Sequence, residues 1–547
     1  MSTPYSPQAM FSSILLTSFI FAIYHSFSCR VVSAFDRDQR LTFRPPPPPH
    51  LAEGEMFNNV LMGSILPLAL VNKALRISPL LVHTDNDSAI VLLVAFATAA
   101  TFANGPPAAA AAGCSDYRIL SRAADILPLA ASTLFLPQFS SHHIPLILPS
   151  LVIQYFFILL TLFKYRRPIS SPSRPPFLPL SLGEFFACSS TLSLIIGDWF
   201  VKTFVSTPPT PPTIEALHLI VMQSGFVGCL VANSIFWCVR KIKHGRILAS
   251  ALLVLLPLVF VEVGLTPHQS LLPDKLFNWE MHWLRFICGF LLENSRLQWI
   301  LYFVMVLVMG GAPAVRLSKS QTGLFSDGTP HADARQKTII ARKFFHIFAV
   351  LLFVPPTIYS SAMMSLSFGV AVCVLITLEV LRLAKQGGAF LDSFINSFLD
   401  EKDCASSFVF THIFLLIGCA IPVWFDCVRG QRGADETLVD PKLLRLAGIL
   451  TVGVGDAFAA LVGVKISQWN PGGGLHWAGS KRTVEGSLGC FTSMYCVIKL
   501  LCWVFDMGKW NWAAVLWFLI STTMLEASTM MVDNLLLPVV GVVCLSY

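Results

Sequence analysis

Long runs of apolar residues alternate with short polar segments along most of this chain. A bilayer core is about 30 Å thick, so a spanning helix needs about 20 mostly apolar residues. The pattern therefore predicts about 13–16 transmembrane helices and no sizeable soluble domain. The stronger predicted spans are 144–163, 185–205, 214–238, 247–265, 299–315, 344–363, 365–383, 408–425, 443–464, 487–507 and 512–525, and the weaker ones are 11–27, 58–72, 89–112, 124–137 and 536–547.

Composition agrees with this pattern. Of the 547 residues, 54% are hydrophobic and 13% are charged, whereas soluble domains carry about 25% charged residues. The chain is therefore neither a soluble globular protein nor a largely disordered one. Its net charge of +7 is too small to indicate a nucleic-acid partner. The sequence predicts an all-α polytopic integral membrane protein.

The distribution of Lys and Arg between the loops predicts the orientation. Cytosolic loops of membrane proteins are enriched in both residues. If the helices alternate in direction, one set of loops carries 20 Lys and Arg and the other set carries 6. The first set should therefore face the cytosol. It comprises 164–174, 239–246, 316–343, 382–402 and 465–482.

The same patterns divide the chain into three segments. Residues 1–57 are typical of an N-terminal anchor followed by a Pro-rich linker. Residues 58–334 form a transmembrane array that is poor in clustered polar groups, and its role stays open. In residues 335–547, charged and small residues gather at predicted cytosolic helix ends. We expect the function to reside there, next to a cytosolic loop at 465–492.

One predicted span carries a carboxylate, because residues Gly453 to Asp456 read Gly-Val-Gly-Asp. A charged group within a membrane span is costly, and such residues usually face a cavity, a partner or an ion. Gly455, Ala459 and Gly463 recur every fourth residue, which is also typical of close helix packing. Packing alone can explain the glycines. It does not explain Asp456, which we expect to be functional.

The next loop combines positive charge with hydroxyl groups. Lys481 and Arg482 are adjacent, and Ser480 and Thr483 flank them among several glycines. Arginine can bind phosphate oxygens with two hydrogen bonds while lysine acts as a point charge. The loop is not a P-loop, because GxxxxGK[ST] is absent. The alternative is a basic pair that anchors the membrane edge, although such an anchor leaves the neighbouring Glu485 unexplained.

Further polar residues lie near other predicted cytosolic helix ends. Glu526 and Asp533 are seven residues apart, so one helix would place them on the same face, where they could hold a divalent cation. The alternative is that both are solvated helix-end residues. His346 could contact a phosphate or orient a carboxylate, although a lone histidine is more often structural. Glu379 and Arg382 should form a local ion pair on one helix.

These clusters converge on one face of the C-terminal half. The residues alone therefore indicate a membrane-embedded enzyme that joins a cytosolic phosphate compound to a substrate resident in the bilayer.

Four segments, in this order, resemble motifs of the dolichol kinase family. Arg342 to His346 resembles the family's Arg-Lys-aromatic-Phe-His helix start, and Gly453 to Asp456 its Gly-Val-Gly-Asp element. Trp477 to Thr492 resembles its CTP-binding stretch, W-P-G-T-K-K-T-x-E-G. Glu526 to Leu535 resembles a final motif shared with phytol kinases and phosphatidate cytidylyltransferases.

The likeness covers about 335–547, and each motif by itself is weak. Three positions differ from the usual residue, with Ala478 for Pro, Ser480 for Thr and Arg482 for Lys. None of these differences removes a charge or a hydroxyl group.

The resemblance implies transfer of the γ-phosphoryl group of CTP to dolichol, with Mg²⁺ or Ca²⁺ as the cation. It also implies an endoplasmic reticulum membrane location with the site toward the cytosol. The site residues it implies are Asp456, Asp533, His346 and Glu485 for catalysis; Trp477, Gly479, Ser480, Lys481, Arg482, Thr483, Glu485, Gly486 and Ser487 for CTP; and Asp456, Asp533 and Glu526 for the metal.

Three alternatives remain at this point. A phytol kinase or another polyprenol kinase would share the motifs, and a CTP:lipid cytidylyltransferase would transfer CMP rather than phosphate. An ion-coupled transporter could use Asp456 and the glycine-rich span to coordinate an ion at the bilayer midplane. No self-similar halves occur in the sequence, which counts against the transporter.

Overall fold

The computed structural model describes a C-terminal unit of the chain in detail. The described residues are 195–196, 199, 203, 214–239, 245–272, 281–292, 296–322, 332–386, 409, 411–430, 439–469, 475–477, 482–507, 511–528 and 533–546. The predicted spans before residue 185, the linker and the proposed boundary at 57 therefore lie outside them. The contacts of residues 202–528 and 532–547 define one compact unit, which contains the helices and the candidate site.

Within the described residues every regular element is a helix, which confirms the predicted all-α polytopic fold. In the described part of the chain, five helices are long and apolar enough to cross a membrane, or six if a bent pair is counted as one span. The helices are α10 (Ile214–Val239), α11 (Gly245–Leu265), α12 (His282–Leu292), α13 (Leu297–Thr322), α14 (Ala332–Tyr359), α15 (Ser361–Leu383), α18 (Thr411–Gly430), α19 (Pro441–Gly448), η6 (Ile449–Asp456), α20 (Ala457–Trp469), α21 (Val484–Phe505), α22 (Trp512–Ser528) and α23 (Asp533–Ser546).

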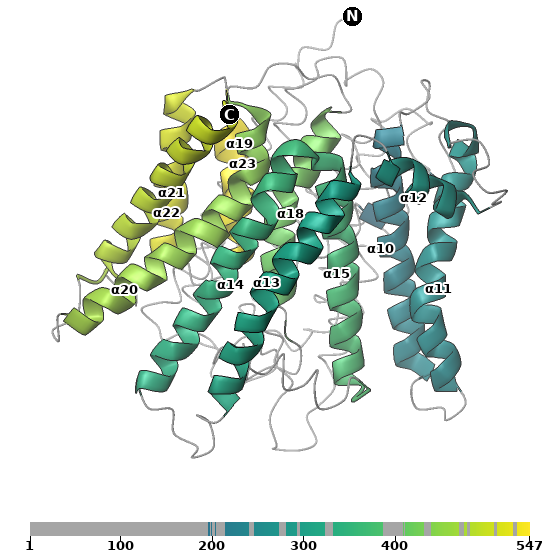
Figure 1. Cartoon of the computed structure of the whole chain (residues 1–547), viewed down its shortest axis with the longest axis horizontal. Coiled ribbons are helices and arrows are strands. Elements are labelled where there is room, and N and C mark those ends of the chain that lie inside the picture. The colour runs from purple at the N-terminus through teal and green to yellow at the C-terminus, as the bar shows by residue number, and fades with distance from the viewer. Residues whose placement is uncertain are drawn as a thin grey trace, which may run out of the picture. The chain divides into compact units, whose positions relative to one another are not determined.

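Helices α10 and α11 run side by side, and α10 also packs against α15 (Figure 1). Gly228 of α10 allows this close approach, because a Cβ there would lie 2.7 Å from the Cα of Pro257 in α11. Buried apolar side chains from α10, α11 and α12 form a shared core that includes Leu217, Val261 and Phe286. Small residues at helix contacts are the usual way in which membrane helices pack closely.

The predicted span 443–464 is observed as Pro441–Ile466, but it is not a uniform α-helix. Its middle part, Ile449–Asp456, is π-helical, and all eight of its residues are buried. π-Helical segments are rare and often mark functional sites. This segment, η6, packs against α14, α21, α22 and α23. The span that carries Asp456 therefore lies at the centre of the C-terminal helices.

Two glycines bring α18, α19 and α23 into close contact. A Cβ at Gly448 of α19 would lie 2.2 Å from the carbonyl oxygen of Gly418 in α18. A Cβ at Gly418 would in turn collide with the backbone of Asn534 in α23. These backbone contacts fix the direction in which η6 leaves α19, and so they help to position Asp456.

Candidate active site

A short antiparallel hairpin leads into α21. The Trp477 N–H donates to the Arg482 carbonyl oxygen at 3.1 Å, and the Val484 N–H donates to the Leu475 carbonyl oxygen at 2.7 Å. The two strands also pair between His476 and Thr483. The hairpin fixes both ends of the connecting loop, 478–481. Gly479, Ser480 and Lys481 belong to that loop and lie outside the described residues, so their predicted phosphate contacts remain a hypothesis.

Side chains at the start of α21 secure this hairpin. Thr483 caps the helix, since its hydroxyl oxygen accepts the Gly486 N–H at 3.1 Å. The Glu485 carboxylate accepts the Leu475 N–H at 2.9 Å. The Trp477 indole N–H donates to Ser487 Oγ at 3.0 Å. Four predicted CTP-binding residues, Trp477, Thr483, Glu485 and Ser487, thus take part in the bonds at the start of α21.

These bonds also engage two backbone N–H groups at the start of α21. The first N–H groups of a helix are often free to bind an anion. Here, however, the Val484 N–H is bonded within the hairpin, and the Gly486 N–H is bonded to the Thr483 cap. These two backbone groups are therefore already satisfied within the protein.

Asp456 lies at the end of η6 and is only 8% exposed. His346 of α14 is 6% exposed, and its Nδ1 lies 3.4 Å from Asp456 Oδ2. His346 therefore lies beside a carboxylate, as one of its two predicted roles requires. A buried charge requires a partner of this kind.

Glycines bring the neighbouring helices up to η6. A Cβ at Gly453 would lie 2.6 Å from a methyl group of Val350 in α14. A Cβ at Gly455 would lie 3.0 Å from the sulfur atoms of Cys490 and Met494 in α21. Close packing is therefore the role of both glycines, and it is this packing that brings α14 and α21 next to Asp456.

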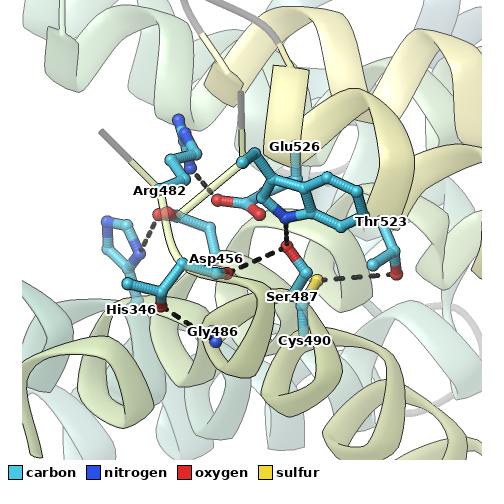
Figure 2. Close-up of polar contacts among 10 residues, drawn as sticks. His346, Asp456, Arg482, Gly486, Ser487, Cys490, Thr523 and Glu526 are labelled. Carbon is cyan, nitrogen blue, oxygen red and sulfur yellow. Dashed lines mark hydrogen bonds and ion pairs between the residues drawn. The ribbon is translucent and has the colours of Figure 1, made fainter. Parts of the chain in front are cut away.

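Arg482 and Glu526 form a second ion pair beside Asp456. The Arg482 guanidinium contacts the Glu526 carboxylate from α22, and Glu526 is only 2% exposed. Figure 2 shows His346, Asp456, Arg482 and Glu526 converging on one region. The four side chains come from α14, η6, the α21 hairpin and α22, so residues distant in sequence assemble one buried polar cluster.

The structure corrects the predicted geometry of the acidic pair. Glu526 and Asp533 do not share a helix face, because α22 ends at Ser528 and α23 begins at Asp533. The Asp533 side chain lies outside the described residues. Among the residues that the structure describes, no group of three or more His, Cys, Asp or Glu side chains could hold a metal ion.

Two polar residues next to the cluster could not be identified from the sequence. Thr523 of α22 contacts Cys490 of α21, with its Oγ1 3.9 Å from the Cys490 sulfur (Figure 2). Both residues are buried next to the cluster. Isolated threonine and cysteine residues in apolar runs look like ordinary core positions, so only the packing of α21 on α22 reveals them.

The predicted pair of Glu379 and Arg382 is confirmed. Arg382 donates two hydrogen bonds to the Glu379 carboxylate, at 2.6 and 2.8 Å. Glu379 also accepts the Val409 N–H at 2.7 Å. The pair therefore ties the end of α15 to the segment that precedes α18, and this role is structural.

Comparison with known proteins returns dolichol kinases. The chain is 26% identical to dolichol kinase EVAN of Arabidopsis thaliana over 391 residues, which are 66% of this chain and 63% of that protein. It is 34% identical to the dolichol kinase of Homo sapiens over 212 residues, 37% of each chain. Dolichol kinase sec59 of Schizosaccharomyces pombe is 27% identical over 200 residues.

The matched regions thus span less than two thirds of each of these relatives. No protein-family profile matches the chain, and no solved structure matches it. The matches to dolichol kinases from a plant, an animal and a fungus agree with the four motifs and with the helical, apolar fold. The chain is therefore similar to dolichol kinases over part of its length.

Proposed function

We propose that this protein is a dolichol kinase that transfers the γ-phosphoryl group of CTP to the terminal hydroxyl group of dolichol. The products are dolichyl phosphate, the lipid carrier for protein N-glycosylation, and CDP. The observation that carries this proposal is the cluster of His346, Asp456, Arg482 and Glu526 among apolar helices, in which every residue except Arg482 is buried. It offers one site where a charged nucleotide and a membrane alcohol can meet.

Arg482 is the described residue best suited to the CTP phosphates. A guanidinium has five N–H donors, so it can contact Glu526 and still donate to phosphate oxygens. Its side chain is 28% exposed, whereas that of Glu526 is 3% exposed. Glu526 thus anchors Arg482 from the buried side. Lys481, in the adjoining loop, would add a second positive charge.

Asp456 is suited to the acceptor alcohol. In the proposed step, the dolichol oxygen forms a bond to the γ-phosphorus, and the bond from that phosphorus to the β–γ bridging oxygen breaks. The hydroxyl proton passes to Asp456, and CDP leaves. His346 would hold the Asp456 carboxylate in position, 3.4 Å away. Phosphoryl transfer depends mainly on such positioning and on charge neutralisation.

The donor set fits Mg²⁺ better than Ca²⁺. Mg²⁺ is commonly bound by one or two carboxylates together with substrate phosphates, whereas Ca²⁺ takes six to eight oxygen ligands. Glu526 contacts Arg482, and Asp456 faces His346. Asp533, at the start of α23, would therefore be the carboxylate that holds the cation together with the CTP phosphates. The cation would neutralise charge on the transferred phosphoryl group.

The proposed location is the endoplasmic reticulum membrane, with the cluster open toward the cytosol. The excess of Lys and Arg in 316–343, 382–402 and 465–482 supports this orientation. CTP is a cytosolic nucleotide, so the orientation agrees with the proposed donor.

Nucleotide and metal dependence test this proposal. Purified protein in detergent would be given dolichol, Mg²⁺ and either CTP, ATP, GTP or UTP, and dolichyl phosphate would be measured. We expect product with CTP, little with the other three, and none after EDTA treatment. Equal rates with ATP would contradict the CTP assignment, and full activity in EDTA would contradict the cation.

A further inference from the structure

A cavity of about 690 Å³ lies between α10, α11, α12 and α15, outside the polar cluster. Its size falls within the range of roughly 300–1,000 Å³ that is usual for ligand pockets. The lining is almost entirely apolar, with side chains such as Phe226, Leu253, Pro257 and Val374. Nothing in the proposed transfer step accounts for it.

The cavity runs along the helices rather than across them. Its lining on α15 extends from Leu366 to Leu381, which is about 22 Å at a rise of 1.5 Å per residue. Helices α10, α11 and α15 all have the length and hydropathy of membrane spans. The cavity is therefore an elongated apolar channel within the membrane-spanning part of this unit, which suits a chain-like ligand.

The lining also excludes a charged occupant. None of the described residues that line the cavity is Asp, Glu, Lys or Arg. The polar residues Cys229 and Thr377 are both contacted by Asn233, whose amide nitrogen lies 3.3 Å from Cys229 Sγ and 3.1 Å from Thr377 Oγ1. Among these described residues a phospholipid headgroup would find no cationic partner, so the chemistry favours an uncharged hydrocarbon chain.

Helix α15 connects this cavity to the polar cluster. It packs against α14, where Phe353 stacks edge-on with Phe368 of α15 at 5.0 Å between ring centroids. The same helix α14 carries His346, which contacts Asp456. We propose that the cavity holds part of the isoprenoid chain of the acceptor alcohol while its hydroxyl group reacts at Asp456. This inference rests on the proposed function.

Gly225 offers a way to fill the cavity without distorting the helices. It lines the cavity, and a Cβ there would meet only Val261, at 3.6 Å, which is an ordinary contact. Gly225→Phe would therefore place a ring in the channel. Ile235→Phe is the matched control, because Ile235 lies on the same helix, is exposed and does not line the cavity.

We expect Gly225→Phe to raise the KM for a long-chain dolichol about tenfold or more, since a methylene-sized change in an apolar pocket is worth roughly 10–200-fold. The KM for CTP and the turnover of a short prenyl alcohol should not change. Ile235→Phe should behave as wild type. An unchanged KM for dolichol in folded Gly225→Phe would overturn the cavity assignment, whereas a wild-type protein inactive on every alcohol would overturn the proposed function.

Photo-crosslinking of the wild-type protein gives a second test that needs no variant. A polyprenol with a diazirine near the far end of its chain should label α10, α11 or α15, and unlabelled dolichol should compete. Labelling that is displaced by phospholipid but not by dolichol would overturn the proposal. So would labelling confined to helices that do not line the cavity.

Discussion

At the scale of single residues, Asp456 and Glu526 are two carboxylates enclosed by apolar helices, and each has a different cationic or polar neighbour. Asp456 faces His346, which can be neutral or charged, whereas Glu526 faces Arg482, which is always charged. The partner of Glu526 is therefore a permanent cation, whereas the partner of Asp456 is an imidazole. This difference agrees with the separate roles proposed for the two carboxylates.

Replacement of Asp456 tests that role. Asp456→Asn should lower kcat about 10²–10⁴-fold, the usual contribution of a general base, and should change the KM for CTP little. Asp440→Asn is the matched control on the same span, because Asp440 caps α19 through the Lys442 N–H and asparagine caps equally well. Normal turnover by Asp456→Asn would rule out this residue as the proton acceptor.

The Arg482–Glu526 pair should contribute to both stability and CTP binding. Arg482→Ala leaves Glu526 buried without its cation, a change that typically costs about 3–5 kcal/mol. We expect a lower melting temperature in detergent and a raised KM for CTP. The double variant Arg482→Ala/Glu526→Gln should regain much of the stability but not the affinity for CTP.

The control for this pair lies away from the cluster. Arg445 Nε contacts Asp426 Oδ2 at 2.5 Å, and Asp426 is likewise buried. Arg445→Ala should lower stability but leave the KM for CTP unchanged. An equal rise in KM for Arg445→Ala and Arg482→Ala would show that the effect reflects general destabilisation and not phosphate contact.

At the scale of elements, the glycines near Asp456 predicted a closely packed span, and close packing is present. The sequence could not predict the π-helical form of Ile449–Asp456, because that form depends on contacts with α14, α21 and α23. The hairpin before α21 was also not predicted. Its pairing of His476 with Thr483 depends on the loop between them and has no pattern of alternating residues.

Packing at Gly448 gives a prediction about stability. In Gly448→Ala the new methyl group would collide with the Gly418 carbonyl oxygen, 2.2 Å away, which a backbone atom cannot easily avoid. We expect a loss of about 1–3 kcal/mol, as is typical of overpacking, measured by thermal unfolding in detergent. Gly463→Ala is the control, since its nearest neighbour is Thr483 Oγ1 at 3.4 Å.

Gly463→Ala should be neutral or slightly stabilising, because alanine favours the helix over glycine by roughly 0.5–1 kcal/mol. Equal melting temperatures for the two alanine variants would contradict the close contact between α18 and α19.

At the scale of the whole molecule, composition and hydrophobic runs predicted the membrane fold, because about 20 apolar residues are needed wherever a helix crosses a bilayer. Asp456 was predicted to be a functional residue because a charge within a span is costly. The contacts between the charged side chains were harder to predict. Arg482 meets Glu526 only after α21 and α22 pack together, and no local pattern shows that contact.

The central claim is that this membrane-embedded cluster transfers the γ-phosphoryl group of CTP to dolichol. In the most direct measurement, purified protein in detergent is incubated with dolichol, Mg²⁺ and CTP. The CTP is labelled at either the γ- or the α-phosphate. Our account predicts labelled lipid from the γ-position only. Label from the α-position would indicate a cytidylyltransferase, and a folded protein that transferred neither label would contradict the account.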